Sequence, residues 1–145
     1  NIQESISRAR FRGITVECFD RVPFDQIPIL IQNCHVGLAG PFGLTTQAKL
    51  VTTTKTFDFM RWQRAVIVGD NQANQRFLDG REVLKVPLGD SFALSQRLEW
   101  CLRNTENLHE IANRGPLRFT RDFSPEAIAL SLRDNSSFKA RLGLG

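Results

Sequence analysis

The sequence predicts an α/β fold, in which a Rossmann-like parallel sheet is flanked by helices. Short β-branched or apolar runs of strand length recur along the chain, and amphipathic segments with helical spacing separate them. The resulting order is strand, helix, strand, helix, strand, helix, strand, followed by further helices. Because parallel strands need crossover connections, this alternation favours right-handed βαβ units.

Four segments are predicted to be strands. Residues 14–19 are β-branched and aromatic and lie between a glycine and an aspartate. Residues 65–68 read Ala-Val-Ile-Val, a continuous apolar run that is typical of a parallel strand buried on both faces. Residues 36–38 and 83–86 are shorter runs of the same kind.

Helices are predicted between and after these strands. Asp25 is placed to cap a helix over residues 26–33, and threonines precede a helix over residues 55–62. Between these two helices, beyond the strand at residues 36–38, residues 39–52 are predicted to be a loop rich in glycine and threonine. The first ten residues are predicted to be the end of a helix. Further helices are predicted over residues 74–78, 91–103, 106–113 and 125–133.

The length and composition indicate one globular domain. The chain has 145 residues, too few for two independent cores, so residues 1–145 are predicted to form a single domain. With 41% hydrophobic and 23% charged residues, the composition excludes a disordered or collagen-like chain. No apolar run approaches the roughly 18 residues of a membrane span. Residues 134–145 are predicted to be a frayed, disordered tail.

The chain is basic, with a net charge of +4 and an isoelectric point near 9.4. This balance suits a phosphate-bearing partner, whether a nucleotide, a nucleic acid or an anionic lipid surface. Arginines occur in two clusters, one within residues 8–12 and one within residues 114–121. Few aromatic residues lie among them, so we interpret both clusters as solvated faces, and no nucleic-acid partner is expected.

The cysteines and histidines do not form a metal motif. Cys18, Cys34 and Cys101 are odd in number and far apart, and we predict buried thiols in a reducing compartment. A structural zinc site needs about four ligands at short spacings, which His35 and His109 do not complete. No metal site is therefore predicted.

In open parallel sheets, ligands bind beyond the carboxyl ends of the strands. That rule selects three loops, at residues 39–54, 69–74 and 87–90. The first loop carries glycines and leads to a helix start at Thr54 and Lys55, where free amides and the helix dipole attract phosphate.

Asp58, one turn beyond Lys55, can accept hydrogen bonds from sugar hydroxyls, so the first loop suits a nucleoside diphosphate. The glycines lack the spacing of the dinucleotide fingerprint and of the P-loop. An ordinary glycine-rich surface loop with a threonine cap remains the alternative.

Several motifs occur together in one order between residue 16 and about residue 131. They are FDRVPFDQIP at residues 19–28, VGL at 36–38 with Phe42 and Gly43, KTFDFM at 55–60, AVIVGD at 65–70, ANQRFL at 73–78 and VPLGD at 86–90. Their order and spacing resemble the carboxyl-terminal, donor-binding domain of a group 1, family four glycosyltransferase of the GT-B fold.

The resemblance implies that the chain binds the nucleoside-diphosphate sugar of a retaining, hexosyltransferase-type enzyme of polysaccharide biosynthesis, without a metal or other cofactor. The donor would be bound by residues on three loops and one helix, namely Phe42, Gly43, Thr54, Lys55, Asp58, Ala73 and Asn74. The resemblance implies that Asp58 contacts the ribose and that Lys55 faces the diphosphate. It also implies that the other residues line the sugar and nucleotide pocket. Asp58 stands where the family has glutamate, and Leu50 stands at a second glutamate position.

The family's domain has two more strands before the point where this sequence begins, together with a separate acceptor domain. We therefore expect a partial domain that carries no catalytic residue and is inactive alone. Its exposed sheet edge favours self-association. The resemblance also implies a cytoplasmic enzyme with peripheral membrane contact on the cytoplasmic side. The alternative hypotheses are a non-catalytic Rossmann-like binding or interaction module and, third, a basic nucleic-acid-binding domain.

Overall fold

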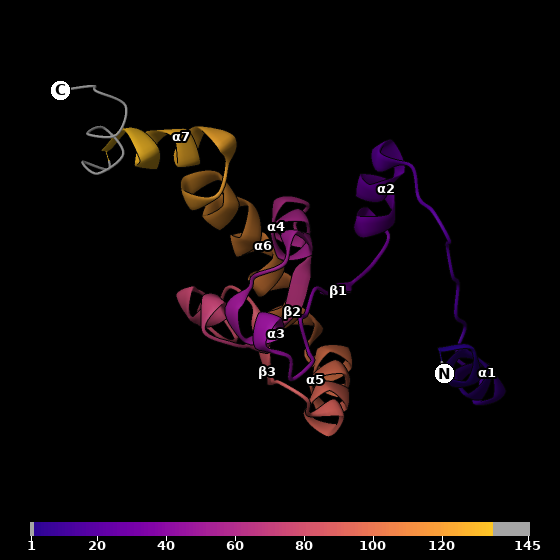
Figure 1. Cartoon of the computed structure of the whole chain (residues 1–145). Coiled ribbons are helices and arrows are strands. Elements are labelled where there is room, and N and C mark those ends of the chain that lie inside the picture. Colours follow the sequence, from indigo (N-terminus) through magenta and orange to yellow (C-terminus); the bar gives the residue numbers. More distant parts are fainter. Residues whose placement is uncertain (1, 135–145) are drawn as a thin grey trace.

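Three parallel strands form the sheet in the computed structural model, which describes residues 2–134. The strands are β1 (Val36–Leu38), β2 (Ala65–Asp70) and β3 (Leu84–Pro87). They lie in the order β1-β2-β3, with Val36 opposite Ala65 and Ile67 opposite Leu84 (Figure 1). The predicted α/β class with a parallel sheet is confirmed. The predicted tail from residue 135 onward lies outside the described residues.

The prediction of a strand at residues 14–19 is wrong. This segment is extended but pairs with no strand among the described residues, and Figure 1 shows it well away from β1. Most of its side chains are exposed, including Cys18, which contradicts the prediction that this thiol is buried. A β-branched sequence favours extended backbone, but a strand also needs a neighbour for its N–H and C=O groups.

The segment before β1 contains α1 (Ile2–Phe11), the 3-10 turn η1 (Phe24–Gln26) and α2 (Ile27–Gln32). The predicted cap by Asp25 is wrong, because Asp25 lies within η1 and neither η1 nor α2 has a side-chain cap. The chain enters α2 through the 3-10 turn η1. Pro28 occupies the first turn of α2, where its missing N–H costs little because the first amides of a helix have no intrahelical partner.

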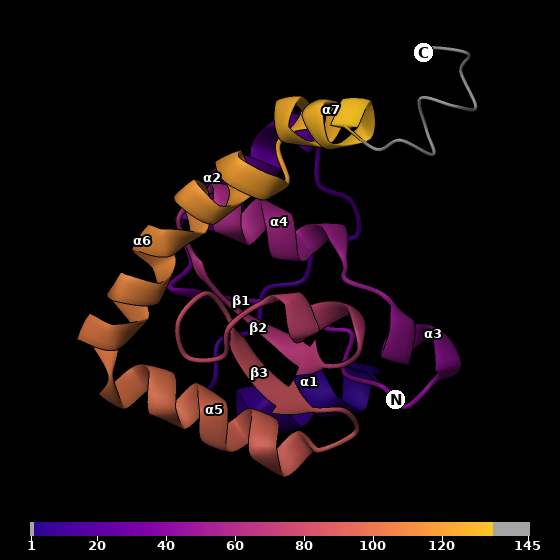
Figure 2. The same cartoon turned by 90° about the vertical axis from the view of Figure 1, so that its left-hand side faces the viewer.

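Helices cover both faces of the sheet. They are α4 (Thr54–Arg61), α5 (Ser91–Arg103) and α6 (Thr105–Asp122), and the 3-10 turn η2 (Ala73–Arg76) follows β2. Figure 2 shows α4 and α5 on opposite sides of the sheet, with α6 running from one side to the other. Asp90 caps α5 as its carboxylate accepts the Ala93 N–H at 2.8 Å.

Strand β2 is the centre of the fold. Ala65 and Ile67 face a core with α5 and the start of α6, whereas Val66 and Val68 face a second core with α4, η2 and the end of α6. All four side chains are at most 1% exposed. The expectation of a strand buried on both faces is therefore confirmed.

Two helical predictions need correction. The region read as a loop over residues 39–52 contains α3 (Thr46–Leu50), whose start is capped by the Thr45 hydroxyl, which accepts the Ala48 N–H at 3.1 Å. The helix expected to end near residue 113 continues to Asp122 and passes through Pro116. The last described helix is α7 (Pro125–Asp134), capped by Ser124.

The close approach of α6 to α4 requires a glycine at position 115 of α6. A Cβ on Gly115 would lie 2.7 Å from the Met60 carbonyl oxygen and 3.0 Å from its Cα. These are backbone atoms that cannot swing aside, so the two helices pack at this distance only with glycine in place.

Within residues 2–134, no helix is long and apolar enough to cross a membrane. The same part of the chain holds no group of three or more metal-ligating side chains.

Candidate functional site

The loops at the carboxyl edge of the sheet are bonded to one another. Thr53 donates from its hydroxyl to the carbonyl oxygen of Ala39, which follows β1, at 2.9 Å. The Gly89 amide, after β3, donates to the carbonyl oxygen of Phe42 at 2.7 Å. A Cβ on Gly69, near the end of β2, would overlap the carbonyl oxygen of Pro41. The loops that follow the three strands therefore form one continuous surface.

The first turn of α4 stands at this surface. Its N-cap is Thr53, but the Thr53 side chain makes no capping bond because its hydroxyl is turned to Ala39. Thr54 and Lys55 are exposed in the first turn, whereas Thr56 is fully buried. The Thr56 N–H donates to the Thr53 carbonyl oxygen at 3.1 Å. The amides at the start of a helix otherwise lack intrahelical partners, and together with the helix dipole they attract an anion.

Lys55 and Asp58 share one side of α4, because residues three apart lie one turn apart on a helix. Lys55 is exposed and Asp58 is half-buried. On another side, Met60 is 1% exposed and packs with the core beneath β2. The helix is thus anchored by its apolar side, and Lys55 and Asp58 lie on a different side of it.

Phe42 and Gly43 lie in the loop after β1. Phe42 is half-buried and packs against the core shared with α5. Gly43 is exposed, and a Cβ there would meet nothing within 4 Å. The structure therefore places both residues at the loop edge, with open space beside Gly43.

Ala73 and Asn74 follow β2, and the structure separates their environments. Ala73 is half-buried, with its carbonyl oxygen accepting a bond from Arg76 Nε at 2.8 Å. Asn74 is fully buried, and its side chain bonds to Thr52 and Gly69 inside the protein. Its amide therefore faces the interior of the protein.

One residue of the site was missed from the sequence. Asn71, directly after β2, is 5% exposed and donates to the carbonyl oxygens of Ala48 and Val51. The available signal was a polar side chain at the carboxyl end of a buried apolar strand, a position where ligand and loop contacts concentrate.

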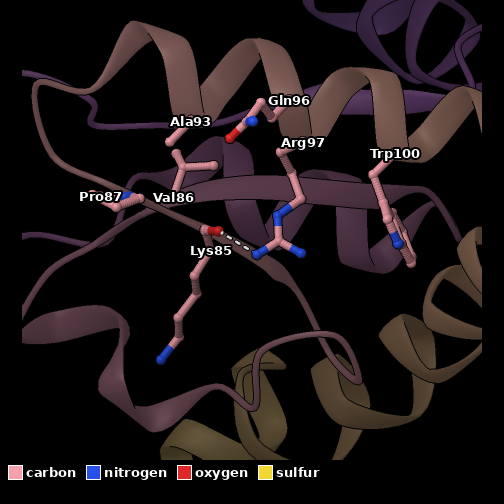
Figure 3. Close-up of a pocket in the computed structure, with 7 residues that line it drawn as sticks. All are labelled: Lys85, Val86, Pro87, Ala93, Gln96, Arg97 and Trp100. Atoms are coloured by element: carbon pink, nitrogen blue, oxygen red, sulfur yellow. Dashed lines mark hydrogen bonds between the residues drawn. The ribbon is translucent and has the colours of Figure 1, made fainter.

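A pocket of about 260 Å³ lies elsewhere, between β3 and α5 (Figure 3). Arg97 Nη2 lies 3.3 Å from Asp79 Oδ2 and donates to the Lys85 carbonyl oxygen at 3.0 Å. Lys85 Nζ lies 3.9 Å from Asp70 Oδ1. Both cations already have carboxylate partners, so this pocket has little charge left for an anionic ligand.

The side chains around that pocket also cover part of the outer edge of the sheet. The Lys85 N–H donates to Asp79 Oδ1 at 2.8 Å, and its carbonyl oxygen accepts from Arg97. An edge strand whose backbone groups are bonded in this way is a poor template for another strand.

The fold and the loop surface at its carboxyl edge place the chain among α/β proteins with a Rossmann-like parallel sheet flanked by helices. No known family and no curated protein matches the sequence. Among solved structures, the chain is similar to Anabaena Alr3699/HepE, whose crystal structure is in complex with UDP. The TM-score is 0.72 at 16% sequence identity, and the match covers 92% of this chain and 36% of HepE. The chain therefore shares the fold of this part of HepE and spans about a third of that protein's length.

Proposed function

We propose that this chain is the nucleotide-sugar-binding part of a glycosyltransferase. The observation that carries the proposal is the juxtaposition of Lys55, Asp58 and the start of α4 at the loop edge of a fold shared with a UDP-bound protein. The sequence motifs resemble family four glycosyltransferases at the same loops. The sequence resemblance and the fold similarity both support a nucleotide as the ligand.

Each residue of the surface has a role in this proposal. The first-turn amides of α4 and Lys55 hold the diphosphate, and Asp58 accepts hydrogen bonds from the ribose hydroxyls. Phe42 and Gly43 border the sugar, and the backbone near Ala73 borders the nucleotide.

Transfer of the sugar breaks the bond from its anomeric carbon to the diphosphate, which leaves with the bonding electron pair. The acceptor oxygen forms the new bond and gives up its proton. Amides and a cation that already point to the diphosphate stabilise the charge that develops on it. The acceptor site and the group that takes the proton belong, in this proposal, to a separate domain, and the 145-residue chain binds the donor without turnover.

We further expect the whole protein to act in the cytoplasm on a glycan, lipid or small-molecule acceptor, with peripheral membrane contact, in polysaccharide biosynthesis. A non-catalytic binding module is the second candidate. It is favoured by Leu50, which is 57% exposed at the end of α3, where the family resemblance has a second carboxylate. Such a module would bind the nucleotide but would not support transfer in the whole protein.

Titration calorimetry with UDP tests the binding role. Lys55→Ala and Asp58→Ala should each weaken UDP binding about tenfold, because a hydrogen bond to a charged group contributes roughly 1.5–3 kcal/mol. Arg12→Ala and Asp20→Ala are matched controls, since they remove the same charges from exposed positions before α2. Unchanged UDP affinity in both site variants would contradict the proposal.

A further inference from the structure

Asn71 anchors the segment that leads into α4. Its side-chain amide donates to the carbonyl oxygen of Ala48 at 2.7 Å and to that of Val51 at 2.9 Å. Ala48 lies in α3, and Val51 is the C-cap of α3. A single buried side chain therefore holds the connection between α3 and α4 at two points.

Asn74 extends the same network. Its Oδ1 accepts the Thr52 hydroxyl at 2.7 Å, and its Nδ2 donates to the Gly69 carbonyl oxygen at 2.8 Å. Its backbone N–H donates to Asn71 Oδ1 at 2.8 Å. The two asparagines are thus bonded to each other and tie Thr52 to the end of β2.

The network is connected to the first turn of α4 through Thr52. Thr52 is followed by Thr53, the N-cap of α4, which is itself bonded to Ala39. Asn74 is fully buried, and the oxygen and the nitrogen of its side-chain amide are each bonded within the protein, so its side chain is not exposed to a ligand. Buried polar groups that are fully bonded hold one geometry, because any displacement leaves them unpaired.

We infer that Asn71 and Asn74 are positioning residues, which set the place of the first turn of α4 and, through it, of Lys55 and the amides that hold the diphosphate. The inference rests on the proposed function. It assigns Asn74 a place behind the binding surface, in contrast to the ligand contact that the sequence resemblance implies. Both asparagines act on the ligand only through residues 51–55.

Hydrogen exchange without any ligand tests the positioning itself. The Asn71→Ala variant lacks the two side-chain hydrogen bonds to Ala48 and Val51. The segment should therefore open more often, and the amides of residues 49–56 should exchange about tenfold faster. The amides of β2 and β3 should keep their exchange rates. Gln75→Ala is the matched control, because it removes one exposed bond, to Asp70, from the same turn. Unchanged exchange of residues 49–56 in Asn71→Ala would overturn the inference.

A second pair of variants tests the effect on phosphate binding. Thr52→Val keeps the shape of the side chain and removes the donor to Asn74, whereas Thr52→Ser keeps the hydroxyl. Thr52→Val should lower UDP affinity about tenfold with UMP affinity within about twofold, because the diphosphate is the part held by α4, and Thr52→Ser should restore UDP binding.

An equal loss for UDP and UMP, or no rescue by serine, would overturn the positioning role. A wild-type chain that binds no UDP would instead refute the proposed function, and the exchange rates would still decide whether the asparagines position α4. Thr52→Val also gives the exchange comparison if Asn71→Ala does not fold.

Discussion

Cys18 and Cys101 lie in opposite environments. Cys18 is exposed in the extended segment before α2, whereas Cys101 is 4% exposed between α5 and the sheet. Burial raises the pKa of the Cys101 thiol, and the nearby Arg97 offsets only part of this effect. Burial also raises the pKa of Cys34. A raised pKa keeps the thiol protonated to higher pH, so less of the reactive thiolate is present.

We therefore expect iodoacetamide at pH 8 to label Cys18 rapidly and Cys101 only on unfolding. Timed quenching followed by peptide mass spectrometry measures the two rates. In the Cys18→Ser variant, the fast phase should disappear. Equal rates at Cys18 and Cys101 in the folded protein would show that the described burial is incorrect.

The residues of the site were predictable to different degrees. Lys55 and Asp58 follow from a helix start at the carboxyl edge of a sheet, because spacing along a helix determines which residues share a face. The burial of Asn74 does not follow from its sequence, since an asparagine after a strand serves a loop or a ligand equally well. For Asn71, the position at the carboxyl end of a buried strand was a signal, but it does not identify what the side chain bonds to. Its partners are carbonyl oxygens more than 15 residues away, and no local pattern reveals them.

The contact between α4 and α6 depends on Gly115. A Cβ there would press on Met60 backbone atoms at 2.7–3.0 Å, so the helices would have to separate. We expect Gly115→Ala to destabilise the protein by roughly 1–3 kcal/mol, as overpacking does in other cores.

Urea unfolding followed by circular dichroism measures this loss. Gly43→Ala is the matched control, because its Cβ would meet nothing within 4 Å and its φ is not in the left-handed region. It should leave the free energy of unfolding within about 0.5 kcal/mol of the wild type. A fully stable Gly115→Ala protein would show that α6 does not cross α4 this closely.

Elements were predictable where local pattern and tertiary setting agree. Residues 65–68 are apolar and lie at the centre of the sheet, so the prediction of a buried strand is confirmed. Residues 14–19 have the same local preference but pair with no strand within residues 2–134, and pairing decides whether a strand forms. The helix predicted over residues 106–113 is shorter than α6, which continues to Asp122 through Pro116. Packing against α4 and the sheet continues the helix past it.

At the scale of the whole molecule, the two edges of the sheet differ. The outer edge of β3 is bonded at Lys85 by Asp79 and Arg97. Strand β1 pairs only with β2 among the described residues, and Leu38 in it is 46% exposed. The segment before β1 also carries exposed aromatic side chains, with Phe11 at 95% and Phe24 at 88%. Apolar surface of this kind favours association.

We expect the chain to self-associate as its concentration rises. Sedimentation velocity should show a coefficient that increases with concentration for the wild type and a constant, monomeric value for Phe11→Ser/Phe24→Ser. Leu102→Ser, which removes an apolar side chain that is 80% exposed on α5, is the control and should behave as the wild type. A wild-type chain that stays monomeric at high concentration would contradict this expectation.

Chemical-shift mapping of UDP on the isotopically labelled chain tests the proposed donor site most directly. The largest amide shifts should occur at Thr54–Asp58 and in the loop over residues 39–45, with saturation at one UDP per chain. Shifts confined to the pocket of Lys85, Arg97 and Trp100, or no shifts at high UDP concentration, would contradict the assignment of the carboxyl edge as the nucleotide site.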